Sequence, residues 1–420
     1  MMYCVYKTLL FVMGPFLVLW THHRVRQGRE DPVRYRERFG KPSQKRPKGK
    51  IIWFHGASNG ECLSFLPVLE AFEKKDPRLK FLVTSGTRTA ATLLKKRLGN
   101  RAIHQFVPLD HPLFVRRFLD YWQPSVAFRT ESDYWPTTIL EMKKRGPLVL
   151  LNGRLSEKTY KRWAYLKSFF KKMLSSFQII FPQSYDDFKR YQVFGLKNIK
   201  MIGNLKFEGA TLSVDVGAVH KLKKEIGRRP LWMASNTHEG EEQYMVDAHH
   251  RLMKTVGKNL LLILIPRHKE RLPAIHDMLR KKKMTFLHRT EGKKITDDVQ
   301  VFIVDTMGEL GIFYSLTNFV FMAGSLYAHI GGHNVLEPAR LGTLPVFGPH
   351  MENNLEMARL LLKNKAAIQV KSPQKIGAVV EGLLKHPQET KKKAETVKSI
   401  LKNINILQPT LDTIEKNIQF

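Results

Sequence analysis

Short apolar runs alternate with amphipathic stretches along most of this chain, and this alternation restricts the fold more than any other feature. Each run is only a few residues long, which suits a buried strand, and helical periodicity separates the runs, as in Ser64–Lys74 and Arg88–Leu98. A repeated strand–helix order predicts a mostly parallel, doubly wound sheet. The strands predicted in the first half are Ile51–His55, Phe81–Thr84, Ile103–Val107, Val126–Arg129, Leu148–Leu151 and Ile179–Phe181.

The alternation stops at a polar interval, 208–230, and then restarts. Because 420 residues exceed what one hydrophobic core usually supports, we place a domain boundary in this interval. We predict two similar α/β domains, residues 51–210 and 211–420, that face each other across a cleft. Residues 372–420 are Lys-rich and are predicted to form packing helices without site chemistry. The strands predicted in the second half are Leu231–Ser235, Leu260–Pro266, Val301–Asp305, Phe319–Ala323 and Leu344–Phe347.

Polar, Gly-rich turns directly follow two strands of the second set. Asp305–Leu310 follows one strand, and Gly324–Ser325 with the later turn Gly331–Pro338 follows the next. Ligands of open α/β sheets bind beyond the carboxyl ends of the strands, and paired glycines such as Gly331 and Gly332 let backbone N–H groups approach an anion. The pattern predicts a nucleotide site, although Gly-rich turns of this kind also occur in α/β domains without one.

The N-terminal residues indicate an association with a membrane. Residues 3–20 are apolar except for Lys7 and Thr8, and they are just long enough to span a bilayer. Residues 21–50 are rich in Lys and Arg, so the positive-inside rule keeps the rest of the chain on the cytoplasmic side. We therefore predict a membrane anchor at residues 1–20 and a basic linker at residues 21–50. A buried or interfacial helix at the same residues is the alternative.

The charge balance requires an anionic partner but does not identify it. The formal net charge is +33, which suits nucleic acid, phospholipid headgroups or a phosphorylated substrate. The two cysteines, Cys4 and Cys62, have no metal-ligand spacing, so we expect neither a disulfide framework nor a zinc site. We also expect no cofactor.

Glu61 is the first catalytic candidate. It lies on a Gly-flanked turn after the strand Ile51–Phe54, where desolvation would raise the pKa of its carboxyl group toward that of a working general base. The alternative is a Glu at a helix N-terminus that interacts with the helix macrodipole.

Two further segments of the first domain carry charged candidates. Glu131 and Asp133 follow the strand Val126–Phe128 and are suited to bind a cation or sugar hydroxyls, or to form a local ion pair with Arg129. Lys206 lies at the end of the first domain, where it is suited to neutralise a phosphate leaving group.

In the second domain, Arg267 ends a strand within Pro266-Arg267-His268 and can present its planar fork to a phosphate or to a base edge. The polar segment 234–242 also follows a strand, and its alternative interpretation is an ordinary helix start with acidic residues in the first turn.

Taken together, these segments resemble the 3-deoxy-D-manno-octulosonic acid (Kdo) transferase family, membrane-associated glycosyltransferases of lipopolysaccharide biosynthesis. The resemblance extends over nearly the whole chain in the same order. Its blocks are residues 53–61, 131–136, 152–156, 203–207, 237–242, 266–268, 305–310 and 331–338.

The resemblance implies a GT-B architecture, with two Rossmann-like domains, and an inverting reaction that moves Kdo from CMP-Kdo to the tetraacyl lipid A precursor, lipid IVA. It implies a location at the cytoplasmic side of the inner membrane, where the anionic leaflet would be a partner. It also implies that Glu61 is the general base and that Glu131 and Lys206 stabilise the transition state. The residues implied to bind CMP are Pro266, Arg267, Met307, Gly308, Glu309, Asn334, Val335, Leu336 and Glu337.

The chain departs from the family pattern at a few positions. The family usually has Val at position 59, Thr-Glu-Leu at 132–134, Ala at 153 and Gly at 323, where this chain has Asn59, Ser132-Asp133-Tyr134, Gly153 and Ala323. We expect the shorter Asp133 and the bulkier Tyr134 to alter the acceptor contacts more than the reaction. Two alternative functions are a GT-B lipid glycosyltransferase that uses a UDP sugar, and a membrane-tethered nucleic-acid binder that is not an enzyme. We expect no nucleic-acid partner, because the second alternative leaves the ordered motifs without a role.

Overall fold

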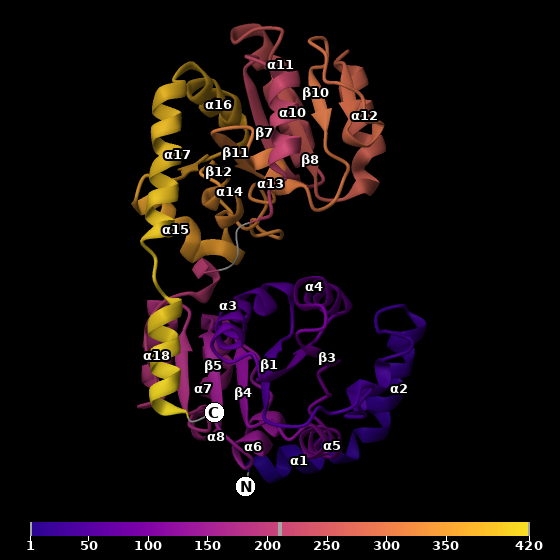
Figure 1. The fold of residues 1–420 in the computed structure, drawn as a ribbon, viewed down its shortest axis with the longest axis vertical. Coiled ribbons are helices and arrows are strands. Elements are labelled where there is room, and N and C mark those ends of the chain that lie inside the picture. The colour runs from indigo at the N-terminus through magenta and orange to yellow at the C-terminus, as the bar shows by residue number, and fades with distance from the viewer. Residues whose placement is uncertain (1, 209–211, 419–420) are drawn as a thin grey trace. The chain divides into compact units, whose positions relative to one another are not determined.

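Two parallel sheets organise the residues described by the computed structural model, 2–208 and 212–418 (Figure 1). Each sheet belongs to its own compact unit. Unit 1 contains the described residues up to 208 together with 405–418, and unit 2 contains residues 212–404. The predicted domain limits also include residues 1, 209–211 and 419–420, which lie outside the described residues.

The sheet of unit 1 has the strand order β3-β2-β1-β4-β5-β6, and its paired strands are parallel. Its strands lie where the sequence predicts them. Buried side chains from the sheet and the surrounding helices, among them Trp53, Trp122 and Phe170, form one core. The strands are β1 (Ile51–Gly56), β2 (Lys80–Ser85), β3 (Ile103–Phe106), β4 (Val126–Thr130), β5 (Leu148–Gly153) and β6 (Ile179–Pro182).

Several helices of unit 1 begin at a capping side chain. Ser58 caps α3 (Asn59–Lys75), and Thr87 caps α4 (Arg88–Leu98). Because Ser58 starts α3 several residues before the predicted Ser64, Glu61 lies in the first turn of the helix. The other helices of unit 1 between β3 and η2 are α5 (Pro112–Trp122), α6 (Pro136–Lys143), α7 (Glu157–Ala164), α8 (Lys167–Leu174) and α9 (Tyr185–Val193), followed by the 3-10 helix η2 (Leu205–Glu208).

Unit 2 has a second parallel sheet, in the order β13-β12-β11-β7-β8-β10-β9. The predicted strands are confirmed, but the prediction missed β9 (Phe286–His288) and β13 (Ile368–Gln369), which are too short to show a periodic pattern. The remaining strands are β7 (Leu231–Thr237), β8 (Leu261–Pro266), β10 (Val301–Ile303), β11 (Phe319–Met322) and β12 (Leu344–Phe347). The α-helices are α10 (Val216–Ile226), α11 (Glu241–Thr255), α12 (Leu272–Lys281), α13 (Leu310–Tyr314), α14 (Leu336–Arg340), α15 (Leu355–Lys363), α16 (Ile376–Lys385) and α17 (Pro387–Lys402).

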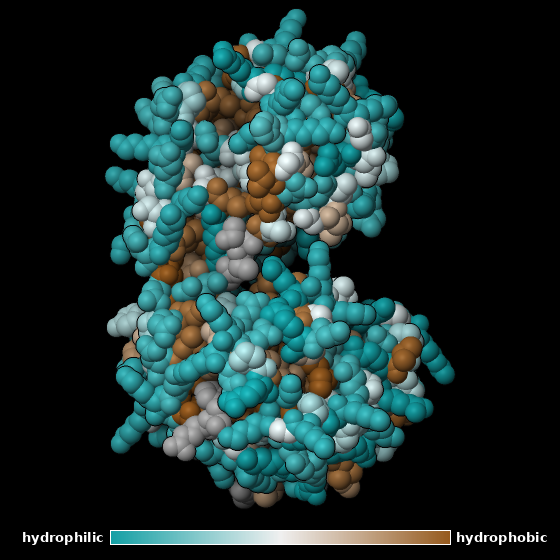
Figure 2. Space-filling view, viewed as in Figure 1, coloured by the Kyte–Doolittle hydropathy of each residue, from teal (hydrophilic) through white to brown (hydrophobic). Residues whose placement is uncertain are grey.

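The N-terminal segment forms two helices, α1 (Met2–Val12) and α2 (Gly14–Arg26), rather than one. Pro15 stands in the first turn of α2, where its missing N–H needs no partner. In the described part of the chain, no single helix is long and apolar enough to cross a membrane, whereas this pair, bent by 56°, passes the same test of length and composition. Apolar patches interrupt the mostly hydrophilic surface over α2 (Figure 2).

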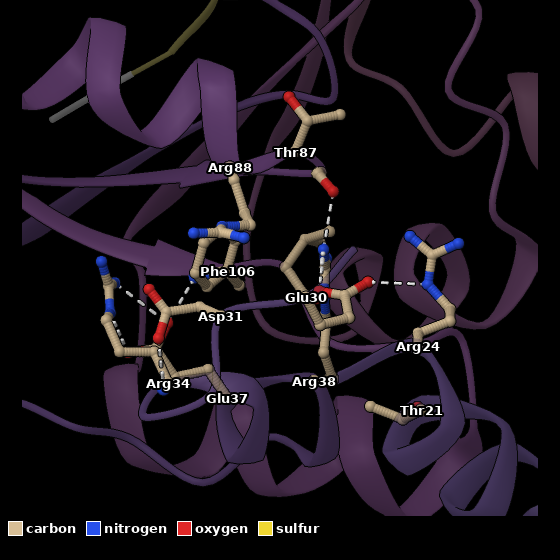
Figure 3. A network of polar contacts seen from close by, with 12 residues as sticks. Thr21, Arg24, Glu30, Asp31, Arg34, Glu37, Arg38, Thr87, Arg88 and Phe106 are labelled. Carbon is tan, nitrogen blue, oxygen red and sulfur yellow. Dashed lines mark hydrogen bonds and ion pairs between the residues drawn. The ribbon is translucent and has the colours of Figure 1, made fainter. Parts of the chain in front are cut away.

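Residues 21–50 were predicted to be a basic linker, and this prediction is wrong for much of the segment. α2 continues to Arg26, and the 3-10 helix η1 (Tyr35–Phe39) follows. The reason is that the acidic residues of the segment pair with its arginines: the buried Glu30 holds both Arg24 and Arg38 at 3.0 Å (Figure 3). Arg38 also donates to the carbonyl oxygen of Gly86 at 2.6 Å, which fastens the segment to unit 1.

The C-terminal helix α18 (Leu407–Asn417) belongs to unit 1, so the predicted second domain, 211–420, is wrong at its end (Figure 1, yellow helix beside the indigo and magenta elements). Glu208 fixes the start of this helix, because its Oε1 accepts hydrogen bonds from the N–H groups of Ile406 and Leu407 at 2.6 and 3.1 Å. Ile414 is fully buried. The predicted helical character of residues 372–420 is confirmed by α16, α17 and α18.

Candidate functional sites at the two sheet edges

The candidate catalytic residues of unit 1 lie at the point where the strand order of the sheet reverses. The chain runs outward from β1 to β2 and β3, then returns to the other side of β1 with β4. Ligands of open α/β sheets bind at such a switch point, beyond the carboxyl ends of the strands. Glu61 follows β1 and Glu131 follows β4, so the topology brings both carboxylates to this point.

Glu61 is fixed by the turn between β1 and α3. Its Oε2 accepts from the N–H of Ala57 at 2.8 Å, and its Oε1 accepts from the hydroxyl of Ser58 at 3.1 Å. Gly56 permits this tight turn, because a Cβ there would lie 2.8 Å from the backbone nitrogen of Cys62. Glu61 is therefore part of the helix N-terminus, as the alternative interpretation stated, and its orientation is set by that role.

The environment of Glu61 also favours a protonated carboxyl group. Burial raises its pKa to about 7, and the negative charges of Asp133 and Glu131 act in the same direction, against the hydrogen bonds from Ala57 and Ser58. A carboxyl group with a pKa near neutrality can accept a proton in a reaction at neutral pH. Glu61 therefore takes part in the helix N-terminus and also has a pKa suited to a general base.

Glu131 and Lys206 form an ion pair beside Glu61. The Nζ of Lys206 lies 2.6 Å from Oε1 of Glu131, whose side chain is 8% exposed. The same Nζ lies 3.9 Å from the position of a Cβ on Gly60, the neighbour of Glu61. Glu131 has a φ of +57°, an uncommon value for a residue other than Gly that places its side chain in this turn. The structure thus brings together the three predicted catalytic residues.

Asp133 takes the ion-pair alternative that the sequence left open. Its Oδ2 lies 2.6 Å from a guanidinium nitrogen of Arg129 and is in contact with Nε2 of His55. Burial alone would raise the pKa of Asp133, but Arg129 and His55 hold it below the ordinary value. His55 is fully buried and its Nδ1 lies 2.8 Å from the hydroxyl of Thr84.

His55 and Asn152 are two supporting residues that the sequence did not single out. Asn152 has a φ of +54°, and its Oδ1 accepts from the N–H of Leu205 at 3.0 Å, which holds the segment that carries Lys206. In the sequence, an Asn at the end of a predicted strand is a weak signal of such a left-handed turn. His55 gave no signal of a supporting role, because a polar residue at a strand end is common.

A cavity of about 480 Å³ lies within unit 1 next to Glu61. Its lining includes the carboxyl groups of Glu61 and Asp133 and the aromatic side chains of Trp135 and Trp163. The cavity can therefore receive a ligand that has both polar and apolar groups. Ala57, Ser132, Tyr134, Thr159 and Arg162 complete the lining.

The predicted nucleotide-binding residues of unit 2 all follow strands of one parallel sheet. Pro266 ends β8 and is followed by Arg267, whose side chain is exposed. Met307 and Gly308 lie after β10 and are exposed, and Glu309 forms an ion pair with Arg289 at 2.9 Å. The carboxyl ends of parallel strands lie at one edge of the sheet, so these residues share that edge.

The predicted segment Asn334–Glu337 lies between β11 and α14. The side-chain amide of Asn334 donates to Oε1 of Glu337 at 3.4 Å, and its Oδ1 accepts from the N–H of Leu336 at 3.0 Å. Val335 and Leu336 are buried, so the polar members of this segment are the ones a ligand can reach.

The expectation that Gly331 and Gly332 present free N–H groups to an anion is wrong. The N–H of Gly332 donates to the carbonyl oxygen of Gly324 at 2.8 Å, and the N–H of Gly331 donates to that of Tyr327 at 3.4 Å. Both glycines have φ near +77°, so they are needed for the shape of the loop.

Glu241 connects two loops of the same edge of unit 2. Its carboxylate accepts from the N–H of Gly324 at 2.6 Å and from that of Leu326 at 3.1 Å, and also from the N–H of His238 at 3.2 Å. The helix-start interpretation of residues 234–242 is therefore correct for Glu241. Among the residues that the structure describes, no group of three or more His, Cys, Asp or Glu side chains is arranged to hold a metal ion.

Comparisons with known proteins agree with this architecture. The family described as 3-deoxy-D-manno-octulosonic-acid transferase (kdotransferase) matches residues 33–209. The chain is 33% identical over 416 residues to the 3-deoxy-D-manno-octulosonic acid transferase of Rickettsia bellii, with 98% of each chain covered. It is 31% identical over 401 residues to that of Haemophilus influenzae, with 92% of each chain covered.

The fold is similar to that of a glycosyltransferase from Rickettsia africae, with a TM-score of 0.58 and 10% sequence identity over 88% of this chain and 98% of that one. At this identity the likeness shows the fold alone. With the two parallel sheets, it supports the GT-B architecture. From its near full-length identity to known members, the chain belongs to the Kdo transferase family, glycosyltransferases of lipopolysaccharide synthesis.

Proposed function

We propose that this protein moves Kdo from CMP-Kdo to the tetraacyl lipid A precursor, lipid IVA, and releases CMP with inversion at the anomeric carbon. The observation that carries the proposal is the position of Glu61, a half-buried carboxyl group with a pKa raised to about 7 at the switch point of unit 1. Family membership supplies the sugar, and this side chain supplies the base that the transfer requires.

In the proposed reaction, Glu61 accepts the proton of an acceptor sugar hydroxyl while the hydroxyl oxygen attacks the anomeric carbon of Kdo. The bond between that carbon and the phosphate oxygen breaks, and its electron pair stays on the phosphate of CMP. The hydrogen bonds from Ala57 and Ser58 keep the carboxylate in a fixed orientation for this proton transfer.

Glu131 and Lys206 are proposed to stabilise the transition state. Positive charge develops on the sugar and negative charge grows on the leaving phosphate as the bond breaks. An ammonium group and a carboxylate held 2.6 Å apart offer one charge of each sign next to the base. The pair is already oriented before substrate arrives, which reduces the reorganisation that the reaction needs.

The cavity beside Glu61 is proposed to receive the sugar and phosphate part of the acceptor. Trp135 and Trp163 are suited to contact the apolar faces of sugar rings, and Arg162 is suited to pair with a phosphate. All three line the same cavity as Glu61, so a sugar bound there would have hydroxyl groups near the base.

The donor is proposed to bind at the strand ends of unit 2. Arg267 is exposed and can pair with the phosphate of CMP, while Glu309, Asn334 and Glu337 offer oxygen and amide groups to the nucleoside. Pro266, Met307, Gly308, Val335 and Leu336 would shape this site around them.

We further propose that α1 and α2 lie in the cytoplasmic face of the inner membrane, next to its anionic lipids. Tyr6 donates to the buried carboxylate of Asp110 at 3.0 Å, so one face of α1 is fastened to unit 1. The other side chains of the pair include large exposed apolar groups, which suits helices that lie in the interface. These groups are Val5, Leu9, Phe11, Val12, Phe16 and Leu19.

The test follows the mass of the lipid after incubation of the full chain with lipid A precursor and CMP-Kdo, and in parallel with UDP sugars. We expect a gain of one or more Kdo residues with CMP-Kdo only. A gain with a UDP sugar and none with CMP-Kdo would contradict the donor assignment. Glu70→Gln, an exposed residue on the same helix as Glu61, is the matched control for handling and should behave as wild type.

A further inference from the structure

Three histidines that no assigned role uses meet at the strand ends of unit 2. His238 follows β7, His268 follows β8, and His333 lies in the loop after β11. The strand order of unit 2 reverses between β7 and β11, so His238 and His333 flank its switch point. This is the place where an open α/β sheet binds its ligand.

The histidines are in direct contact with one another. Nε2 of His238 lies 2.7 Å from Nε2 of His333, and the two rings stack with centroids 5.0 Å apart. The ring of His268 meets that of His238 edge-on at 5.4 Å. Since a hydrogen bond between two Nε2 atoms needs one donor and one acceptor, one proton lies between the two rings.

The loop backbone is built to hold His333 in this position. Gly324 has a φ of +70°, and a Cβ there would lie 2.6 Å from Cδ2 of the His333 ring, so a larger residue would displace the imidazole. Glu241 fixes the N–H groups of both Gly324 and His238. A cluster supported on both sides by one buried carboxylate is positioned, and is more than a chance meeting of surface side chains.

Among the residues that the structure describes, no carboxylate forms an ion pair with His238, His268 or His333. In the free protein, burial lowers the pKa of His238 and of His333 to about 4, and the neighbouring His268 and Arg267 act in the same direction, so both rings are neutral at pH 7. His329 acts on His238 in the same direction. The carboxylate of Glu241, which supports the cluster, accepts hydrogen bonds from backbone N–H groups.

We propose that His238, His268 and His333, together with Arg267, form an oxyanion subsite for the donor in which the His238–His333 pair takes up a proton when the anion binds. The inference rests on the proposed function, because CMP-Kdo carries two oxyanions, the phosphate and the sugar carboxylate. An anion at this edge would supply the missing counter-charge, and an opposite charge within about 4–6 Å favours the protonated imidazole.

A proton gained in this way has a chemical use. When the bond from Kdo to CMP breaks, the electron pair remains on a phosphate oxygen, and the phosphate gains one negative charge. A protonated imidazole pair beside that oxygen would balance the new charge, while the proton of the acceptor hydroxyl goes to Glu61. The two protons are therefore handled by different units.

The test measures proton uptake by calorimetry. CMP is titrated into the full chain at pH 7 in buffers of different ionisation enthalpy, with His238→Gln and His333→Gln as variants. We expect wild type to take up about half to one proton more per CMP than either variant. The pair would be about half protonated at pH 7 if the bound anion raised its pKa from about 4 to about 7, and fully protonated if the pKa rose further. The difference between the proteins cancels any proton that CMP itself gains or loses.

His276→Gln is the matched control. His276 and His288 also place Nε2 atoms 2.8 Å apart in unit 2, but outside the cluster, so this variant should keep the full uptake. An equal loss in His276→Gln would overturn the inference. Binding of both CMP and CMP-Kdo to wild type without extra proton uptake would overturn it too and leave the proposed donor intact, whereas no binding of either ligand would contradict the donor assignment itself.

Three ligands identify which oxyanion occupies the subsite. Uptake with CMP would assign the phosphate, and uptake with CMP-Kdo alone would assign the sugar carboxylate. The same uptake with cytidine, which has no oxyanion, would contradict the inference.

A measurement without variants is also decisive. The affinity of wild type for CMP-Kdo should fall about three- to tenfold from pH 6.5 to pH 8.5, and a rise or no change would contradict the proposal.

Discussion

The two units share a parallel α/β design, but they treat the charged groups at their sheet edges in opposite ways. In unit 1 the carboxylates are largely buried and paired with cations of the same unit, as Glu131 is with Lys206 and Asp133 with Arg129. In unit 2 Arg267 and Met307 are exposed, and both rings of the His238–His333 pair are neutral at pH 7.

This difference indicates a division of labour. Partly buried groups that are oriented in advance suit proton transfer and transition-state stabilisation, because little has to move during the reaction. Exposed cations and neutral imidazoles suit the capture of an anion from water, because the ligand then supplies the missing charge. Substitutions in unit 1 should therefore affect turnover most, and substitutions of the exposed donor-binding residues of unit 2 should mainly affect donor affinity.

The largest expected effect is that of Glu61→Gln. The amide keeps the size of the side chain but cannot accept the proton, so we expect transfer to fall by about 10²- to 10⁴-fold. CMP affinity, measured by calorimetry, should stay within a factor of two of wild type, an order-of-magnitude expectation for a group with no part in donor binding. An equal loss of CMP binding would contradict the division between the units.

Lys206→Met should come next. It removes a cation from the site and leaves the buried carboxylate of Glu131 without this partner, so we expect transfer to fall by about 10²- to 10³-fold. Turnover per folded molecule, with folding monitored by circular dichroism, separates catalysis from stability. Lys197→Met, at an exposed position nearby in the chain, is the control. Unchanged turnover in the folded fraction would limit Lys206 to a structural role.

Arg267→Ala should weaken CMP binding about ten- to hundredfold, which is the usual loss of affinity when a hydrogen-bonded charge pair is removed. Glu337→Ala should also weaken CMP binding. Turnover at saturating donor should change much less. Lys269→Ala removes an exposed cation two residues further along and should change neither quantity substantially. If Arg267→Ala lowered turnover and left CMP affinity intact, Arg267 would not be a donor-binding residue.

The pH dependence of transfer should report the carboxyl group of unit 1. Glu61 must be deprotonated to accept a proton, and its pKa is raised to about 7. Below pH 7, kcat/KM should therefore fall with each pH unit, and the fall should approach tenfold per pH unit. Asp133→Asn removes a negative neighbour that raises this pKa, so it should move the fall to lower pH. A profile that stays flat down to pH 5 would exclude Glu61 as the base.

The smallest effect is expected from Tyr6→Phe. Loss of the hydrogen bond to Asp110 should lower the free energy of unfolding of unit 1 by about 1–3 kcal/mol, measured by urea denaturation. CMP affinity should remain that of wild type, because Tyr6 belongs to unit 1. Tyr185→Phe, at an exposed position, should leave stability unchanged. If Tyr185→Phe lowered the free energy of unfolding by as much, the hydrogen bond between Tyr6 and Asp110 would not be what stabilises unit 1.

The strands could be predicted, because a buried run is a pattern local to each strand. That Glu61, Glu131 and Lys206 act at one site was implied only by the resemblance to the Kdo transferase family, because their proximity depends on the order of the strands in the sheet. The structure of residues 21–50 could not be predicted in the same way. Its arginines suggested a solvated linker, and their partners became visible only when Arg38 was found against Glu30 and Gly86. Charge counted along a sequence does not reveal which charges are buried together.

The histidine cluster escaped prediction for a related reason. His238, His268 and His333 lie in three separate motifs, and each motif has an ordinary explanation of its own. Their contact follows from the order of β7, β8 and β11 in the sheet, which the sequence does not state. Sites assembled from single residues on distant loops are the ones that local spacing cannot reveal.

The return of α18 to unit 1 has a consequence for how the protein is made. During synthesis, all of unit 2 leaves the ribosome before α18 does, although α18 packs against α3 of unit 1 and buries Ile414 there. Unit 1 therefore cannot finish folding on its own as the first domain of the nascent chain. A gene cut after residue 208 would encode a unit 1 that lacks one of its own helices.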